Sequence, residues 1–265
     1  MPQFYIFYHL LSRGRLPNFW IGKYPVTNAQ YRRFLEAPDF AERALWEGFP
    51  KFGEPPGYKE LGDWGETGWQ WLQSKLGKDK VVYPRSWQDK NFGMAQAKAP
   101  VVRLTWYEAN AYCQWLLKHW HELAEGAQNP GLRPTLVRLP TEAEWVLAAG
   151  GDQPTGRYPW DAPGKATTAV QEIVQRANVE ASKIGHTTAV DAYPQGASQP
   201  YGIFDLAGNV WEWQANYYRA EHDYLALRGG SWGDPHGSAR VAERHSDHPG
   251  GVWDSYGFRV AALPS

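Results

Sequence analysis

Histidine and aspartate side chains, which bind metal ions and transfer protons, gather in one short segment near the C-terminus of this chain. The segment holds three of the eight histidines and three aspartates, namely His236, His245, His248, Asp234, Asp247 and Asp254. Their spacing matches no familiar pattern of metal ligands, so solvated side chains on a surface are the simpler interpretation. A redox-metal site at the three histidines is the alternative.

Two motifs enclose this segment: Leu227-Arg228-Gly229-Gly230-Ser231-Trp232 before it and Gly257-Phe258-Arg259-Val260 after it. The residues between them have almost no aliphatic periodicity that could build a core, which favours a surface loop held at its two ends. We therefore predict a ligand-binding surface within residues 233–256. Its residues are Gly233, Asp234, His236, Ser238, His245, Ser246, Asp247, His248, Gly251, Trp253, Asp254 and Ser255. Trp253 and Tyr256 are expected to be aromatic anchors, because recognition loops combine aromatic with small polar residues.

Three arginines near this surface have two interpretations. Arg240, Arg244 and Arg259 could bind an anionic ligand through bidentate hydrogen bonds. Their regular placement favours a structural role, in which they hold irregular backbone through hydrogen bonds to carbonyl groups.

The composition excludes some classes of partner. The 27 Lys and Arg residues nearly balance the 28 Asp and Glu residues, so no strong field draws the chain to nucleic acid or to an anionic membrane. The single cysteine, Cys113, excludes an intrachain disulfide and a site with several thiolate ligands. Cys113 shares a helical face with apolar residues, which predicts a buried and inert thiol.

The N-terminal run Phe4–Tyr8 lacks a basic start and is too short for a signal peptide, and no apolar stretch reaches membrane-spanning length. We expect no membrane insertion and a cytoplasmic default, with display on a cell surface or a phage also compatible.

Three capping boxes predict where helices begin: Thr27-Asn28-Ala29-Gln30, Thr105-Trp106-Tyr107-Glu108 and Thr141-Glu142-Ala143-Glu144. The expected helices cover residues 28–36, 106–123 and 142–149. Short strands are expected at 19–24, 101–104, 188–190, 202–204, 211–213, 224–227 and 257–260. Residues 37–100 are interpreted as loops with short helices and residues 151–177 as mostly loop. Together these expected elements predict an α+β fold with small antiparallel sheets, few helices and much irregular loop.

The ordered motifs resemble those of the formylglycine-generating-enzyme or sulfatase-modifying-factor family. The resemblance rests on residues 19–31, 100–109, 138–145, 205–213 and the two C-terminal motifs, and is weak over residues 37–100. It implies a single C-type-lectin-like domain over residues 1–265. That domain would carry a loop-rich insertion at about 37–100 and a C-terminal segment at 228–260 that faces the ligand.

The chain departs from the catalytic members of the family. Members that oxidise a substrate cysteine use two cysteines after the Gly-Gly-Ser-aromatic motif, and the best-matching positions here are Asp234 and Ala239. A copper-thiolate oxidase needs thiolates to hold the soft metal. We therefore expect no enzymatic activity.

Another branch with this fold is the variable proteins of diversity-generating retroelements, which end in Gly-Gly-Ser-Trp, a mutable run and Gly-Phe-Arg. The run Ser238–Arg244 resembles their Ala-Arg-x-Ala-x-Arg core. Adenine-directed mutation produces mostly Asp, His, Ser, Gly and Tyr, the residue types enriched here. Glu243 and Trp253 do not arise by adenine-directed mutation of Asn-type codons, so they would be fixed positions or come from other template codons.

The resemblance also implies a calcium site. Asp205, Gly208, Val210 and Glu212 match the family positions that bind calcium through two side-chain oxygens and two backbone carbonyls, which suits a hard cation. The alternative is that Asp205 caps a turn and that Glu212 pairs with Arg228 or Arg259. No cofactor is required, and calcium would be structural.

The resulting hypothesis is a protein that binds a protein or glycan ligand through residues 233–256, and not nucleic acid. The variable-protein resemblance implies that this surface is a target of a diversity-generating retroelement, and ordinary members of the family that do not mutate share the same two enclosing motifs. The alternatives are an enzyme of the superfamily with altered chemistry, and a fixed sensor module that acts with a kinase or a protease.

Overall fold

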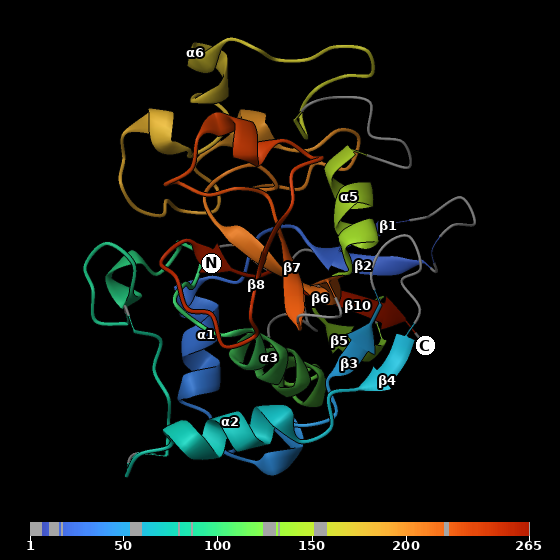
Figure 1. Ribbon diagram of the computed structural model, residues 1–265, viewed down its shortest axis with the longest axis vertical. Coiled ribbons are helices and arrows are strands. Elements are labelled where there is room, and N and C mark those ends of the chain that lie inside the picture. Colours follow the sequence, from blue (N-terminus) through green and yellow to red (C-terminus); the bar gives the residue numbers. More distant parts are fainter. Residues whose placement is uncertain are drawn as a thin grey trace.

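The computed structural model describes residues 7–10, 16, 18–53, 60–78, 80–85, 87–123, 131, 133–150, 158–219 and 223–264, and the structural statements below concern these residues. Its elements are short, and irregular segments join them (Figure 1). The α+β fold with small sheets and few helices is confirmed.

Two sheets organise the described chain. The first contains β1 (Phe7–Leu10), β2 (Phe19–Gly22), β10 (Ala261–Pro264) and β5 (Pro134–Arg138), in the order β1-β2-β10-β5. The second contains β4 (Glu60–Asp63), β3 (Pro50–Phe52), β6 (Trp211–Arg219), β7 (Tyr224–Arg228) and β8 (His245–Asp247) in that order, with β9 (Tyr256–Gly257) paired to β6. The second sheet therefore contains strands from both ends of the segment 233–256.

Three helices begin at the capping boxes. They are α1 (Asn28–Leu35), α3 (Trp106–Lys118) and α5 (Glu142–Gly150). In each box the threonine hydroxyl accepts a hydrogen bond from the amide three residues later, and the Gln or Glu at that position accepts one from the threonine amide. These three start points are confirmed, although α3 ends at Lys118 rather than near residue 123.

Several predicted strands are wrong. Residues 101–104, 188–190 and 202–204 form no strand, and the strand expected at 257–260 is replaced by β9 and β10 on either side of residues 258–260. Val101, Val102 and Leu104 are all at most 2% exposed, so their apolar character reflects packing on every side and not a two-sided strand.

The segment 37–100 contains more structure than its sequence indicated. Besides the 3-10 helices η1 (Arg43–Leu45) and η2 (Met94–Gln96) it forms β3, β4 and the helix α2 (Thr67–Lys75). β3 joins the second sheet by a parallel pairing of Phe52 with Asn216. The remaining short elements are α6 (Val170–Ile173), η3 (Glu180–Ser182), η4 (Pro194–Gly196) and η6 (His236–Ala239). The parts of the predicted loops at 54–59 and 151–157, and residues 4–6, lie outside the described residues.

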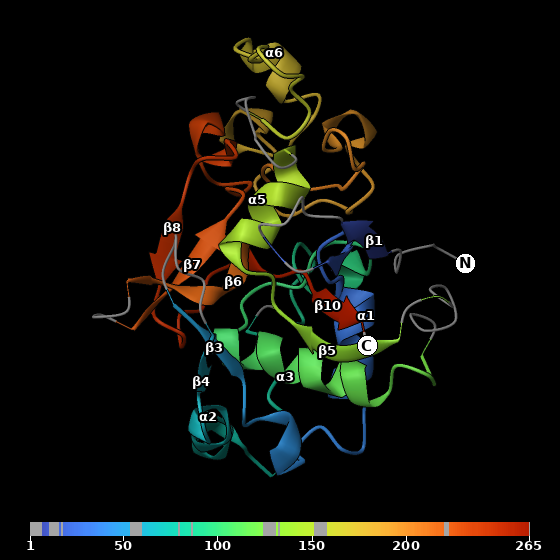
Figure 2. The same cartoon turned by 90° about the vertical axis from the view of Figure 1, so that its right-hand side faces the viewer.

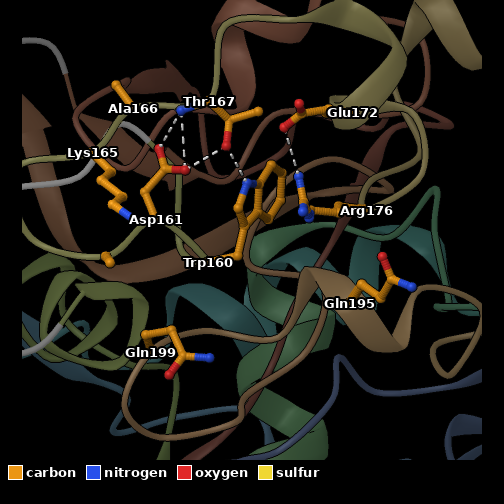
Figure 3. Close-up of a pocket in the computed structure, with 10 residues that line it drawn as sticks. Trp160, Asp161, Lys165, Ala166, Thr167, Glu172, Arg176, Gln195 and Gln199 are labelled. Atoms are coloured by element: carbon orange, nitrogen blue, oxygen red, sulfur yellow. Dashed lines mark hydrogen bonds and ion pairs between the residues drawn. The ribbon is translucent and has the colours of Figure 1, made fainter.

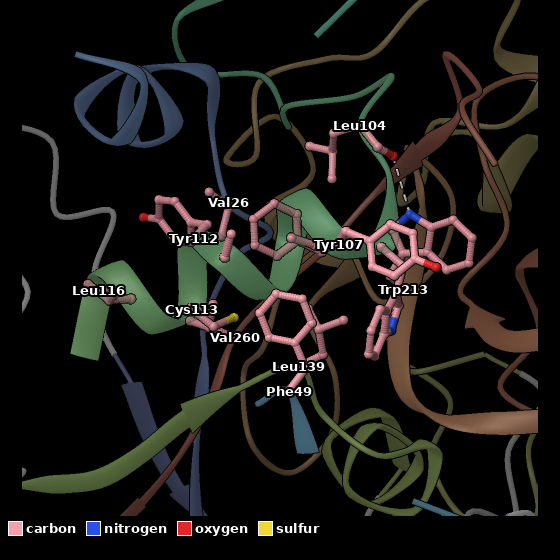
Figure 4. Close-up of a cluster of buried hydrophobic side chains, with 14 of the residues drawn as sticks. Val26, Phe49, Leu104, Tyr107, Tyr112, Cys113, Leu116, Leu139, Trp213 and Val260 are labelled. Atoms are coloured by element: carbon pink, nitrogen blue, oxygen red, sulfur yellow. Dashed lines mark hydrogen bonds between the residues drawn. The ribbon is translucent and has the colours of Figure 1, made fainter. Parts of the chain in front are cut away.

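Figures 1 and 2 show α2 at one end of the molecule, α6 at the opposite end, and the two sheets between them. The main apolar cluster surrounds α3 and contains side chains from Val26 to Ala262 (Figure 4). Cys113 lies inside this cluster, 1% exposed, and burial raises the pKa of its thiol. The predicted buried thiol is confirmed. No described helix has the length and apolar character needed to cross a membrane.

Candidate recognition site

The residues 233–256, called the display segment below, follow β7 after the turn at 229–232, and buried charges hold that end. The Arg228 guanidinium donates from Nε to Glu142 Oε1 at 2.7 Å and from Nη1 to the carbonyls of Val241 and Glu243 at 3.0 and 3.1 Å. Arg244 makes two further bonds of 2.7 Å to the Glu142 carboxylate. Burial opposes ionisation of Glu142, but the two arginines outweigh it and lower its pKa overall. One carboxylate of α5 thus fixes both the end of β7, at Arg228, and a point inside the display segment, at Arg244.

Two glycines make the turn from β7 into the display segment possible. Gly229 and Gly230 have φ values of 105° and 73°, in the left-handed region that favours glycine. A Cβ atom on Gly230 would lie 2.9 Å from the backbone of Ala239. The turn therefore brings η6 against the end of β7 by direct backbone contact.

A second buried ion pair holds the other end of the display segment. Arg259 donates from Nε and Nη2 to the two carboxylate oxygens of Glu212, each at 2.6 Å, and both residues are fully buried. Its guanidinium also donates to the carbonyls of Gly22 and Phe204 at 3.0 and 2.9 Å. The Trp145 indole donates to the same carboxylate at 2.8 Å.

These contacts decide between the two interpretations of the arginines. The predicted structural role is confirmed for Arg259, which bonds two carbonyls, and Arg244 bonds the Glu142 carboxylate. Arg244 also lies over the ring of Tyr218, 4.2 Å from its centroid. Arg240 is half-buried, and its Nε atom has no hydrogen-bond partner among the described residues.

Backbone hydrogen bonds from outside the display segment hold its interior. The amides of Trp106, Arg103 and Trp211 donate to the carbonyls of Pro249, Trp253 and Ser255 at 3.0, 3.1 and 2.8 Å. β8 pairs with β7, so that Ala226 faces Ser246 and Leu227 faces His245. The path of this segment is thus set mainly by groups that are not its own side chains.

The buried indole of Trp211 joins two parts of the surface. Its Nε1 donates to Asp234 Oδ2 at 2.9 Å, and its ring lies 5.2 Å from that of His245. Asp234 Oδ2 also accepts from the Ser231 hydroxyl. Trp211 is 6% exposed and Trp213 is 0% exposed, which confirms that both lie in the core. The contacts with Trp211 bring the 233–238 and 245–255 parts of the display segment together.

The exposed part of the surface lies around Trp253, whose side chain is 57% exposed. The Trp253 indole donates to Asp247 Oδ2 at 2.9 Å, which fixes the ring toward solvent. A Cβ atom on Gly251 would lie 2.5 Å from that Asp247 oxygen, so the close approach depends on glycine. His245 and His248 are also exposed, as is Gly233.

Tyr256 differs from its prediction as a surface anchor. It is only 5% exposed, because β9 pairs with the start of β6 and turns the ring inward against Trp213, at 5.4 Å. Its hydroxyl lies 2.7 Å from His245 Nε2. Burial, and then the nearby Asp247 carboxylate, raise the pKa of the Tyr256 hydroxyl.

The other residues of the predicted surface are half-buried: Asp234, His236, Ser238, Ser246, Asp247, Gly251, Asp254 and Ser255. Some of their side chains also support structure. Asp254 accepts from Arg103 at 2.9 Å, and its carbonyl accepts from the Trp232 indole at 3.1 Å. The surface thus combines exposed side chains with aspartates that hold the loop.

The three histidines have separate partners. His236 Nδ1 lies 3.0 Å from the Tyr158 hydroxyl, His245 bonds Tyr256, and His248 Nδ1 accepts from the Gly250 amide at 3.1 Å. Among the described residues, no three His, Cys, Asp or Glu side chains form a group that could hold a metal ion. The redox-metal alternative therefore has no support from the geometry of these histidines.

The four positions of the implied calcium site lie around a buried turn. Asp205 and Gly208 have positive φ values, and the Asp205 carboxylate accepts from Asn209 at 2.9 Å. Burial raises the pKa of Asp205 to about 7, and the nearby Glu212 charge adds to the rise. The observed Arg259–Glu212 pair matches the alternative interpretation of Glu212. In donor chemistry the two carboxylates still fit a hard cation, since each carboxylate oxygen can accept more than one contact.

Sequence reasoning missed two supports of the site. The sequence indicates Glu142 only as part of a capping box, although the cap itself uses Glu144 and Glu142 bonds Arg228. A second acidic residue in the box that the cap does not need is the one local sign of this other role. Arg103 was placed in a strand, whereas its φ of 59° and its bond to Asp254 put it beside the display segment. No local pattern indicated that contact.

The fold and the site together define a domain of the formylglycine-generating-enzyme type whose C-terminal loop is anchored at both ends by buried arginine–glutamate pairs. The family described as "Sulfatase-modifying factor enzyme 1-like domain" matches residues 11–263, and the chain belongs to this family.

Three similar proteins differ in their described roles. The serine/threonine-protein kinase pkn1 of Chlamydia pneumoniae is 32% identical over 93% of this chain, which spans 33% of that kinase. The inactive C-alpha-formylglycine-generating enzyme 2 of Bos taurus is 30% identical over 92% of the chain and 77% of the relative. Among solved structures, Treponema denticola variable protein 1 superposes with a TM-score of 0.55 at 21% identity, covering 93% of this chain and 85% of that one.

Proposed function

We propose that this domain binds a ligand through the display segment and that the side chains of this surface vary. The observation that carries the proposal is the separation of roles within the segment. Its backbone is held from outside by Arg228 and three backbone amides, and the buried Arg259 anchors the chain just beyond its end, while His245, His248 and Trp253 are exposed. A framework of this kind tolerates exchange of the exposed residues, because Arg228 and the backbone hydrogen bonds hold the loop independently of these side chains.

Two further observations support a surface diversified by a retroelement. The mutable residue types Asp, His, Ser and Gly make up 13 of the 24 residues of the segment, and the fold is shared with a protein named variable protein 1. The ligand class is a protein or a glycan, because an exposed indole beside small polar groups is typical of recognition surfaces.

The proposal includes no catalysis. Asp234 and Ala239 stand where the oxidising relatives have cysteines, and the one thiol of the chain, Cys113, is buried in the core. Calcium at Asp205, Gly208, Val210 and Glu212 is proposed as a structural ion. It would compensate the buried Asp205 carboxyl beside Glu212 and take no part in binding by the display segment.

A pair of matched libraries tests the framework. One randomises four display positions, His245, Ser246, His248 and Trp253, and the other randomises four buried positions, Trp213, Leu225, Leu227 and Phe258. Both are expressed on yeast and sorted for folded protein and for binding to immobilised lysozyme. We expect folded clones and lysozyme binders from the display library and few folded clones from the core library. Equal loss of folding in both libraries would contradict the proposal.

A second function, a fixed sensor module, is favoured by one specific observation. The chain matches a segment that makes up about a third of a serine/threonine-protein kinase. In that case the display segment recognises one ligand and does not vary among cells of the source. Metal analysis of the purified protein separates both binding functions from an enzyme, which would hold stoichiometric copper or iron and consume oxygen with a thiol substrate.

A further inference from the structure

A cavity of about 500 Å³ lies outside the display segment, beside α6 and η4 (Figure 3). All ten residues that line it fall between positions 160 and 199, and none belongs to the display segment. Its size lies within the range of small-molecule sites in proteins. The cavity is therefore a candidate for a second, independent binding site.

A fixed aromatic ring forms part of the wall. Trp160 stacks on Tyr158 with ring centroids 4.9 Å apart and planes 4° from parallel, and its indole donates to the Thr167 hydroxyl at 3.1 Å. Tyr158 is 2% exposed, and its hydroxyl bonds His236, so the support of this stack is itself held in place. Trp160 remains half-buried and borders the cavity.

Polar groups surround the indole. Asp161 accepts from the Thr167 hydroxyl at 2.6 Å and from the Tyr158 amide at 3.0 Å, which orients its carboxylate before any ligand arrives. Gln195 and Gln199 also line the cavity, and Figure 3 shows their side chains well separated from each other around it. Each amide offers both donors and an acceptor, and both glutamines are exposed.

The charges on the wall cancel. Lys165 and Arg176 carry positive charge and Asp161 and Glu172 carry negative charge, with Glu172 bonded to Arg176 at 3.3 Å. A charged ligand gains no net attraction from such a wall. A neutral ligand with many hydroxyl groups can use both the donors and the acceptors, and an apolar face of its ring can lie on an indole, whose face carries negative charge.

We propose that this cavity binds a neutral sugar ring, stacked on Trp160 and hydrogen-bonded by Gln195 and Gln199. The free sugar and the end of a glycan chain share this chemistry. None of the lining residues belongs to the display segment, and the Tyr158 hydroxyl, behind the stack, links the two through its bond to His236.

Saturation-transfer NMR on the full chain tests the proposal. The probes are glucose, galactose, mannose and N-acetylglucosamine, each as the free sugar and as its methyl glycoside, with glucuronate and glucosamine as charged controls. We expect at least one neutral probe to bind in the millimolar range, as is usual for ligands of this size. Preference for a methyl glycoside indicates the end of a glycan chain, and preference for the reducing form indicates a free sugar.

Variants locate the binding. The double variant Gln195→Ala/Gln199→Ala removes two exposed amides and is expected to weaken binding by about ten-fold or more, because each lost hydrogen bond costs several-fold in affinity. Trp160→Phe keeps an aromatic plate and is expected to weaken binding less than Trp160→Ala. The matched control Gln73→Ala, on the exposed surface of α2, leaves binding unchanged, as does Trp253→Ala in the display segment.

Three results overturn the proposal: no neutral probe binding at tens of millimolar, tighter binding of glucuronate or glucosamine, or sugar binding that survives the glutamine double variant but is lost in Trp253→Ala. The last result would move the sugar to the display segment and leave the proposed function of that segment intact.

Discussion

Replacing Glu142 by glutamine tests whether buried charge holds the start of the display segment. Glu142 Oε1 accepts from Nε of both Arg228 and Arg244, and Oε2 accepts from Arg244 Nη2 and Asn216 Nδ2. Glutamine presents an NH₂ group to one of these donor sets and removes the charge that balances two guanidinium groups. Arg228 is then no longer held in place, and its hydrogen bonds to the carbonyls of Val241 and Glu243 weaken.

The expected loss is large because the carboxylate is fully buried. Breaking one partner of a buried ion pair costs about 3 to 5 kcal/mol. The Arg244 side chain is 29% exposed and can turn toward water, which places the expected loss for Glu142→Gln at the lower end, about 3 kcal/mol. For a chain of this length that is a fall in Tm of about 10 °C. Denaturant unfolding followed by circular dichroism measures the free energy, and hydrogen exchange at residues 241–244 reports the local loosening.

The pH dependence of stability provides a second, independent test of the role of Glu142. The pKa of Glu142 is lower in the folded state than the ordinary value of about 4.3 expected after unfolding. Its contribution to stability is therefore fully present above about pH 4.3 and is lost as the pH falls through the folded pKa. The difference between wild type and Glu142→Gln must shrink in acid.

The matched control is Glu36→Gln, which removes a surface pair with Arg32 in which both side chains are more than half exposed. It should cost less than about 0.5 kcal/mol. If Glu142→Gln also costs less than about 1 kcal/mol, comparable to a surface pair, the reasoning about the buried pair is refuted.

Three further outcomes follow from single contacts. Gly230→Ala should lower the free energy of unfolding in urea by about 2 kcal/mol, because its Cβ would lie 2.9 Å from the Ala239 backbone at a positive φ. The control Gly233→Ala, whose Cβ would lie 4.0 Å from the nearest atom, should lower it by less than about 0.5 kcal/mol. Equal losses for the two variants would contradict the role of Gly230 in the turn. The buried thiol of Cys113 should react with a disulfide reagent at least about 100-fold more slowly in the native protein than in denaturant, and equal rates would show that the thiol is accessible. Calcium in place of a chelator should raise the Tm of the wild type but not of Asp205→Asn, and an unchanged wild-type Tm would exclude a structural calcium ion.

Local signals in the sequence predicted what depends on local contacts. The capping boxes at Thr27, Thr105 and Thr141 use groups three residues apart, so the helix starts were readable without knowledge of the fold. Strands depend on distant partners. Val101 and Leu104 look like strand residues, but in the described part of the chain they belong to no strand and are buried on all sides.

The candidate site shows the same limit. Trp253 and Tyr256 were grouped as anchors from composition, but the Tyr256 amide donates to the Trp253 carbonyl and the chain then pairs with β6, which buries Tyr256 and leaves Trp253 exposed. The pairing of Glu142 with Arg244 spans 102 positions, and no spacing in the sequence encodes it.

The most direct test of the central claim is deep sequencing of the codons for residues 232–257 and their flanking DNA across a population of the source cells or phage. The account predicts substitutions confined to adenine-derived positions, enriched at exposed sites such as His245 and His248, with unchanged codons for Arg228 and Arg259 and a near-copy template alongside. An invariant segment without a template would contradict the variable surface and leave the fixed sensor as the function to pursue.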